Sequence, residues 1–578
     1  MKVLALILVA FLSQQARPGT TSTIRGVVLR SGTTTPVDKA IVELHPNKDA
    51  EPRAVTTSSN GRFEFLNVPP GFYQLNASRS GYLNTSLGQR GVSGSGRDLK
   101  VEPGTTVDNL ELSMTATGAI SGRVFDDTGE PLANVTVEAL KYSYADGERT
   151  LATVGSDTTN DLGEFRLFWL PPGQYHLSAI PEGNGNDHTL TFLKGKGGIK
   201  MLAGSGFTEA VFFELDGASA GVKLDRASPG VKSDRALVPV YYPGTPDPQF
   251  ATTVEVRSGA DVRGIDFRLT RVATRKVRGT LMDSLTGQPS ASGSVSLIPR
   301  SPSGARFANH SSHSENGTFE FTSVRPGAYF VVANANIGSE DGNDRVIGGS
   351  TPIEIGESDL NSVVVTLQRA VDIEGAITLE GPATLPTEVH PLLALVRPQR
   401  SEHYAEYMDD INTRFRIPNV LEGDYRLRWE SSNELPPGVY LKSVSFGPVD
   451  ALNNSIHIDQ RTRDRLEVVL GANAGGVTGT VVDRERKPAA GVRVVLIPDA
   501  APRQRNDLYQ NTFSDESGNF RFERIPPGSY SLFAWEDIED GLWRDAEFLR
   551  RHAGSGKSLH IVEGGRGTVE VVVVPSVL

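Results

Sequence analysis

The stretch that decides the fold is DESGNFRFERIPPGSYSL, residues 515–532, because four further copies of it are recognisable along the 578-residue chain. Recurrence of one pattern along a chain is the mark of repeated structural units. We therefore expect five copies of one module. The other copies are SSNGRFEFLNVPPGFYQL (58–75), NDLGEFRLFWLPPGQYHL (160–177), SENGTFEFTSVRPGAYFV (314–331) and DINTRFRIPNVLEGDYRL (410–427).

Each copy has the pattern of a β-hairpin with one buried face. Phe520 and Phe522 alternate with polar residues, and a period of two places both rings on the same side of a strand. Pro527-Gly528 then supplies a fixed φ followed by a tolerated positive φ, so a tight turn is expected before the chain returns through Tyr530. The fourth copy has Glu422-Gly423 instead, and we expect its turn to relax.

Two further features extend the hairpin to a complete module. A glycine-containing strand opens each copy, as at Thr478-Gly479-Thr480-Val481, and a β-rich segment closes it, as at Val569–Val574. About seven short strands in roughly 100 residues, with no long helical pattern, are typical of a small antiparallel β-sandwich. We expect an all-β tandem array of about five such modules, at 21–116, 117–272, 273–370, 371–472 and 473–578.

Three of these modules depart from the common pattern. The second carries a Gly-, Lys- and Asp-rich insertion at about 183–240, and the fourth is degenerate in its hairpin. In the fifth, Leu542, Ala546 and Leu549 recur at helical spacing, which predicts one short amphipathic helix at about 541–551 docked on the sandwich.

The N-terminus indicates export. Residues 1–20 begin with Lys2, continue through the apolar run Val3–Leu12 and become polar at Ser13, which is the layout of a secretory signal. No later apolar run approaches the length of a bilayer span, so we expect no membrane span after signal removal. The expected location is the periplasm, the outer surface or the medium.

Composition excludes several classes of function. The chain has no cysteine, which removes disulfides, thiolate nucleophiles and Cys-type zinc sites. Its net charge of −11 provides no overall basic field for phosphate backbones, so nucleic acid is not an expected partner.

The repeat line, its opening glycine strand and the turn Asp127-Thr128-Gly129-Glu130-Pro131 resemble the carboxypeptidase regulatory-like domain. The resemblance implies a transthyretin-like, or carbohydrate-binding-like, sandwich over nearly all of residues 21–578. It implies no peptidase chemistry, because this module is the non-catalytic companion in metallocarboxypeptidases. Longer stretches, among them 241–245, 435–443 and 533–537, resemble exported multi-repeat proteins of Acidobacteria.

Motifs for catalysis are sparse, and we expect no catalytic residues, metal or cofactor. His403 and Glu406 have the HxxE spacing of zinc carboxypeptidases, but they lie within a β repeat and lack the surrounding enzyme domain. A hydrolase, or an accessory subunit of a metallocarboxypeptidase-type enzyme, remains the alternative function. The other residues considered are a third ligand from His457, His552 or His560, the pair His310 and His313, and the phosphate-loop-like Gly554–Ser558.

Binding surface is the remaining source of function. Trp535 and Phe533 are out of phase with Tyr530 and Leu532, so they point to the opposite face of their strand, and Trp543 lies close by in sequence. Exposed rings of this kind stack on sugars, and these three are the candidate ligand-binding residues. A second sheet or the short helix covering that face is the structural alternative. The expected function is a non-enzymatic envelope-binding, adhesion or scaffold protein, with a polysaccharide or an envelope protein as partner.

Overall fold

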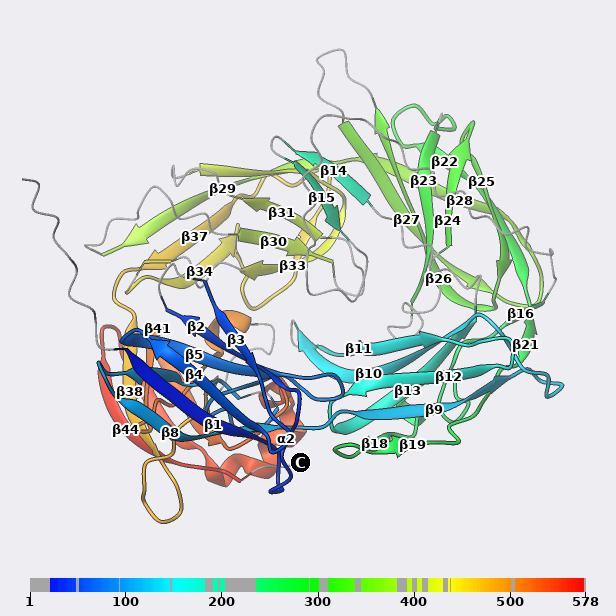
Figure 1. Ribbon diagram of the computed structural model, residues 1–578. Coiled ribbons are helices and arrows are strands. Elements are labelled where there is room, and N and C mark those ends of the chain that lie inside the picture. The colour runs from blue at the N-terminus through cyan, green and yellow to red at the C-terminus, as the bar shows by residue number, and fades with distance from the viewer. Residues whose placement is uncertain are drawn as a thin grey trace, which may run out of the picture. The chain divides into compact units, whose positions relative to one another are not determined.

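The computed structural model is built almost entirely of β-strands in small sheets, which confirms the all-β sandwich prediction (Figure 1). In the part of the chain that the structure describes, no helix is long and apolar enough to cross a membrane. The expected signal at 1–20 and much of the insertion at 183–240 lie outside that part. The described residues are 21–47, 51–92, 94–145, 148–181, 191–195, 198–202, 235–290, 292–300, 310–337, 345–381, 392–397, 403–407, 414–429, 435–436, 438–499 and 505–575.

The chain divides after Thr117 into two compact units. The first unit is a two-sheet sandwich with sheet orders β4-β1-β8 and β3-β2-β5-β6, and β7 also pairs with β5. Phe63, Phe65 and Leu75 lie in the core between these sheets. Its strands are β1 (Ser22–Arg30), β2 (Ile41–Pro46), β3 (Arg53–Thr56), β4 (Arg62–Val68), β5 (Gly71–Ser78), β6 (Thr85–Ser86), β7 (Asp98–Val101) and β8 (Thr106–Met114).

The second unit begins with the second repeat, whose main sheets have the orders β12-β9-β19 and β11-β10-β13-β17. Strand β20 also pairs with β9, and β18 with β13. The strands are β9 (Gly118–Phe125), β10 (Val135–Ala145), β11 (Glu148–Thr158), β12 (Glu164–Leu170), β13 (Gly173–Pro181), β14 (Thr191–Gly195), β15 (Gly198–Leu202), β16 (Arg235–Leu237), β17 (Val240–Tyr241), β18 (Val254–Val256), β19 (Asp261–Val262), β20 (Phe267–Arg268) and β21 (Arg271–Ala273), with the 3-10 turn η1 (Pro248–Phe250).

The third repeat closes into a barrel in the order β22-β25-β24-β23-β26-β27-β28. Closure occurs because the long β27 pairs with β26 along its length and also with β28 through Ile347 and Gly348. The sequence pattern predicted a small antiparallel β-sandwich here. The strands are β22 (Arg275–Asp283), β23 (Ser292–Pro299), β24 (His310–Glu315), β25 (Thr318–Val324), β26 (Gly327–Ile337), β27 (Arg345–Ile355) and β28 (Leu360–Arg369).

The fourth repeat is a sandwich with orders β32-β29-β37-β34-β35 and β31-β30-β33-β36, although its hairpin motif is degenerate. Trp429 lies in its core, together with Tyr425 and Leu427. The strands are β29 (Val371–Glu380), β30 (Leu392–Val396), β31 (His403–Tyr407), β32 (Arg414–Val420), β33 (Gly423–Trp429), β34 (Tyr440–Phe446), β35 (Val449–Asp450), β36 (Ile456–Ile458) and β37 (Leu466–Gly471).

The fifth repeat has the sheets β41-β38-β44 and β40-β39-β42-β43, and the short helix α2 (Ala546–His552) begins inside the interval expected for it, about 541–551, and ends one residue beyond it. The Asp545 carboxylate caps this helix by accepting hydrogen bonds from the backbone N–H groups of Glu547 and Phe548. The strands are β38 (Gly475–Val482), β39 (Arg493–Pro498), β40 (Gln510–Phe513), β41 (Asn519–Ile525), β42 (Gly528–Trp535), β43 (Lys557–Ile561) and β44 (Arg566–Val572), with 3-10 turns η2 (Asn506–Leu508), η3 (Leu542–Arg544) and η4 (Ala553–Ser555).

The opening strand of each repeat lies between the hairpin strand and the closing strand. It pairs antiparallel with the former and parallel with the latter, as β38 does with β41 and β44. The repeat glycine of this strand is required by close approach, because a Cβ on Gly479 would lie 2.5 Å from Cζ of Phe520 and still closer to the carbonyl oxygen of Val569. The parallel pairing of the closing strand was not evident from the pattern, which indicated only that a strand is present there.

The repeat tyrosine ties the hairpin turn to the core. In the fifth copy, the Tyr530 hydroxyl donates to the backbone carbonyl of Pro526 at 2.8 Å, four residues upstream. Because a buried carbonyl without a partner costs free energy, this bond explains why a tyrosine rather than a phenylalanine follows the turn. The same bond joins Tyr73 to Pro69, Tyr175 to Pro171, Tyr329 to Arg325 and Tyr425 to Leu421.

Candidate functional site

The three aromatic residues predicted to bind ligand are core residues of the fifth repeat. Trp535 is 0% exposed, and Phe533 and Trp543 are also buried. The Phe533 and Trp535 rings stack with centroids 4.9 Å apart, and Phe548 of α2 packs on Trp535 at 5.9 Å. The rings do lie on the opposite face of β42, as their phase indicated, but α2 covers that face and leaves them no exposed surface for a ligand.

The histidines considered as metal ligands are held separately by local partners. His457 Nδ1 lies 2.8 Å from Asp424 Oδ1, and His552 Nδ1 lies 2.9 Å from the Phe548 carbonyl oxygen. His560 Nδ1 lies 3.2 Å from the Ser529 hydroxyl. No group of three or more His, Cys, Asp or Glu side chains that could hold a metal ion occurs among the residues that the structure describes.

The remaining motifs fall on regular strands or turns. His403 and Glu406 lie on β31, which pairs with β30, and His310 and His313 lie on β24, which pairs with β23. Gly554–Ser558 runs from η4 into β43, so a helical turn precedes a strand. A phosphate-binding loop has the reverse order, in which a strand leads to a helix N-terminus.

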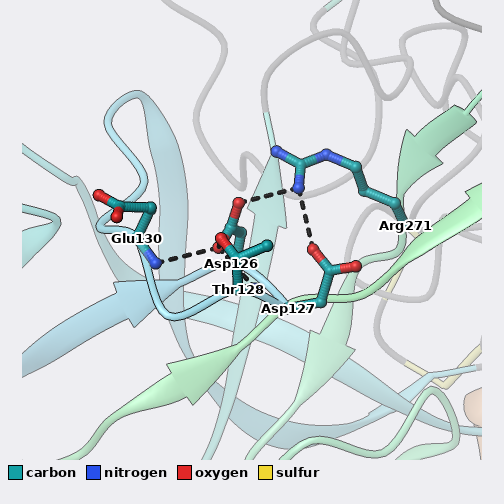
Figure 2. A network of polar contacts seen from close by, with 5 residues as sticks. All are labelled: Asp126, Asp127, Thr128, Glu130 and Arg271. Carbon is teal, nitrogen blue, oxygen red and sulfur yellow. Dashed lines mark hydrogen bonds and ion pairs between the residues drawn. The ribbon is translucent and has the colours of Figure 1, made fainter.

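A polar network in the second repeat is centred on Asp126, at the turn that carried the family resemblance (Figure 2). Asp126 Oδ1 accepts hydrogen bonds from the Thr128 hydroxyl at 2.6 Å and from the backbone N–H groups of Thr128 and Glu130. Its Oδ2 accepts from Arg271 Nη1 at 2.8 Å, and the same guanidinium nitrogen reaches Asp127 Oδ1 at 2.9 Å.

This Asp126 network is structural rather than reactive. The Thr128 hydroxyl and the Arg271 guanidinium together hold the pKa of Asp126 far below its usual range. A carboxylate with both oxygens engaged and a strongly lowered pKa is a poor general base near neutral pH. Its effect is to join the turn after β9 to β21, which lie 145 residues apart in sequence.

The structure exposes a different aromatic pair, Phe168 and Trp169, which the sequence pattern did not single out. Phe168 is 55% and Trp169 61% exposed at the end of β12, and their rings form an edge-to-face pair with centroids 5.0 Å apart. The aligned repeats did contain a signal for this pair, because two aromatic residues occur together at these positions in the second copy alone. The other copies have Leu66-Asn67, Thr322-Ser323, Pro418-Asn419 and Glu523-Arg524 at these positions.

A β-bulge is the reason both rings point outward. Phe165 and Leu167 alternate inward as expected, but the register of β12 against β9 shifts between Leu167 and Leu170. Trp169 takes φ +58° at the shift, so the strand exposes two successive side chains before Leu170 returns to the core. The alternation of inward and outward side chains, from which burial was predicted, breaks at such an inserted residue.

Residues 23–115, 119–192 and 476–537 match the carboxypeptidase regulatory-like domain family. These three segments are carboxypeptidase regulatory-like. This confirms, over these three segments, the resemblance inferred from the repeat motif. The matched carboxypeptidase regulatory-like segments include Trp169 and the buried Trp535, whereas Trp543 lies just beyond the last of them.

Solved structures similar to this chain include several pilins. A minor pilin of Streptococcus agalactiae has 15% identity and a TM-score of 0.21, with 44% of this chain covering 98% of the pilin. A streptococcal ancillary pilin has 14% identity and a TM-score of 0.19, with coverage of 52% and 99% respectively. The major pilin subunit BcpA of Bacillus cereus has 12% identity and a TM-score of 0.15, with coverage of 60% and 99%.

These TM-scores are too low for the pilins to carry an argument about this chain. No curated protein matches the chain in sequence. Support for a function therefore comes from the residues of the chain itself.

Proposed function

We propose that this protein is an exported, non-catalytic binding or scaffold protein of the cell envelope, with a polysaccharide or an envelope protein as its partner. The observation that carries the proposal is that His457, His552, His560 and Asp126 are each engaged in structural contacts with local partners or with a neighbouring strand. Asp126, the carboxylate with the most strongly lowered pKa, has both oxygens occupied by its own turn and by Arg271. We therefore place partner binding on the outer faces of the sheets.

Repetition of the core supports the same proposal. Large hydrophobic clusters of the described residues fall at 24–114, 120–269, 277–367, 373–470 and 477–571, each within one of the expected modules. We propose that the five modules fold around these cores and act as display units. Repeats of this kind multiply binding surface without adding reactive chemistry, which suits adhesion or scaffolding. The signal-like layout of residues 1–20 supports delivery to the envelope.

Cell fractionation and mass spectrometry of the mature chain test this proposal. The full sequence, with a C-terminal tag, is expressed in a diderm bacterium beside a variant in which Val3–Leu12 is interrupted by two arginines. We expect the unaltered chain in the periplasm, the envelope or the medium, with about 20 N-terminal residues removed, and the variant inside the cell at full length. An unaltered chain that stays in the cytoplasm with Met1–Thr20 attached would overturn the proposal.

A further inference from the structure

The exposed pair Phe168 and Trp169 is an outlier among the repeats. The residues at the position of Trp169 are Asn67, Ser323, Asn419 and Arg524, and all five adopt a φ between +55° and +59°. Asparagine tolerates this left-handed conformation well, whereas a bulky aromatic residue is rare there. Trp169 is therefore held in an unfavourable backbone conformation while more than half of its side chain is in water. Strained exposed residues of this kind gather at functional sites.

Packing gives no structural reason for this tryptophan. In the other four repeats the bulge has the same left-handed φ without an aromatic residue, so the fold does not need a ring at this position. Phe168 contacts Trp169 edge to face, with an interplanar angle of 81°, and this mutual contact leaves much of each ring in water. The pair thus presents aromatic surface at one end of an otherwise polar sheet face.

The rest of that face has planar hydrogen-bonding groups. Arg166 points outward from β12 and pairs with Ser121 of β9, and its guanidinium lies 3.7 Å from Asp261 of β19. Asp261 also accepts from Arg263 at 2.7 Å. The hydrogen bond from Arg263 holds the pKa of Asp261 below its usual value, so this carboxylate is ionised at neutral pH.

A second ion pair continues the polar face along the same two strands. Arg123 Nη2 of β9 lies 2.6 Å from Glu164 Oε1 of β12. The face therefore combines aromatic rings with three guanidinium groups and two carboxylates that pair with one another. Rings that stack on a pyranose face, beside charged groups that bond its hydroxyls, are the chemistry that binds a sugar chain.

The open edge of β12 does not favour an extended peptide as the occupant. An added strand needs free backbone groups along the edge, and the Arg166 N–H already donates to Asp157 Oδ2 at 2.7 Å. With three arginines against two carboxylates, the face carries little net charge and gives no strong preference for an acidic or a basic protein segment. A polysaccharide makes its contacts through ring faces and hydroxyls. Its binding requires neither free backbone groups along the strand edge nor a net charge on the face.

We propose that Phe168 and Trp169, with Arg166 and Asp261 beside them, form a binding face for a pyranose polysaccharide. This inference rests on the proposed envelope-binding function and names its ligand class and its site. The rings stack on the apolar face of a sugar residue. Arg166 donates to hydroxyl oxygens and Asp261 accepts from hydroxyl groups along the chain.

Co-sedimentation of the full mature chain with insoluble polysaccharides tests the proposal. The probes are peptidoglycan sacculi, chitin and cellulose, with soluble dextran and xylan examined by affinity electrophoresis. The variants are Trp169→Asn and Phe168→Ala, and the matched control is Phe72→Ala, because Phe72 is a 54% exposed aromatic residue of the first repeat. We expect at least one probe to be retained, with a tenfold or greater loss of affinity in both variants and no change in the control.

Thermal unfolding of the same variants separates binding from a structural role. Asparagine suits the left-handed φ that the other repeats assign to it, so Trp169→Asn should keep or raise the unfolding temperature while it loses binding. Loss of binding together with a lowered unfolding temperature would assign Trp169 a structural role and overturn the proposal.

Three other outcomes also overturn it. These are retention that both variants preserve, retention of a proline-rich peptide but of no polysaccharide, and no retention of any probe by the folded wild type. None of the three removes the envelope function, because export and envelope location are measured by fractionation and do not depend on Trp169.

Discussion

Gly479→Ala tests the close packing on which every repeat depends. Gly479 lies on β38 between Phe520 of β41 and Val569 of β44. A Cβ at this position would lie 2.5 Å from Phe520 Cζ, whereas real Cβ atoms stay beyond 3.0 Å, so the ring would have to retreat by about 0.5 Å. The Val569 carbonyl oxygen lies closer still and is fixed by the parallel ladder, so the strands themselves must separate.

The cost follows from these contacts. Overpacking a well-filled core costs about 1–3 kcal/mol, and a backbone obstacle favours the upper part of that range. Replacing glycine by alanine also stiffens the unfolded chain, which offsets about 0.4–1 kcal/mol. We therefore expect the fifth repeat to lose about 2 kcal/mol of unfolding free energy in Gly479→Ala.

Urea unfolding of the full mature chain, followed by tryptophan fluorescence, measures this change. Trp535 and Trp543 are buried in the fifth repeat and report on its unfolding. Gly554→Ala is the control, because a Cβ there meets no atom within 4 Å. An unfolding midpoint for Gly479→Ala equal to that of the control would refute the packing argument.

A double variant locates the clash. Phe520→Leu removes the ring from Gly479 but leaves the Val569 carbonyl in place. Because residues in contact have non-additive effects, Gly479→Ala should cost less in the Phe520→Leu background than alone. Strict additivity would show that the ring does not press on the glycine.

Three further predictions follow from single contacts. Tyr530→Phe leaves the Pro526 carbonyl without its 2.8 Å bond and should cost about 1–3 kcal/mol in urea unfolding, with no change expected if water replaces the hydroxyl. Trp535→Ala should cost about 3–5 kcal/mol because the ring is buried, whereas a change within about 0.5 kcal/mol would mean an exposed ring. The pKa of Asp126 is lower in the folded protein than its value of 3.8 in the unfolded chain, so this carboxylate stabilises the fold above about pH 4 and stabilises it less as the pH falls below 3.8. The difference in unfolding free energy between wild type and Asp126→Asn should therefore shrink from pH 6 to pH 3. Asp127→Asn is the charge-matched control, and an equal response of both variants to pH would contradict the Asp126 assignment.

The local sequence pattern was sufficient to predict which residues form the core of each hairpin. The alternation of Phe520 and Phe522 predicted their inward face, and both are buried in the structure. Helical spacing predicted a helix at about 541–551, and α2 occupies Ala546–His552, the second half of that interval and one residue more. These features depend on neighbours within a few residues, so the order of residue types contains the necessary information.

The candidate site could not be predicted in the same way. The opposite phase of Trp535 was correct, but the phase of a strand does not reveal what packs on its outer face, and α2 covers it. The exposure of Trp169 was not predicted, because a bulge breaks the alternation at that point. The contact between Asp126 and Arg271 joins residues 145 positions apart, and no local spacing indicates it.

The sequence by itself determined the repeat, the all-β class and the residue types that fill each hairpin, because these follow from backbone preferences and from alternation over a few residues. Tertiary structure alone decided whether the rings of Trp535 and Trp169 are buried or exposed. It buried Trp535 under a helix and exposed Trp169 at a bulge, because burial depends on segments that are distant in sequence and on the exact register between strands.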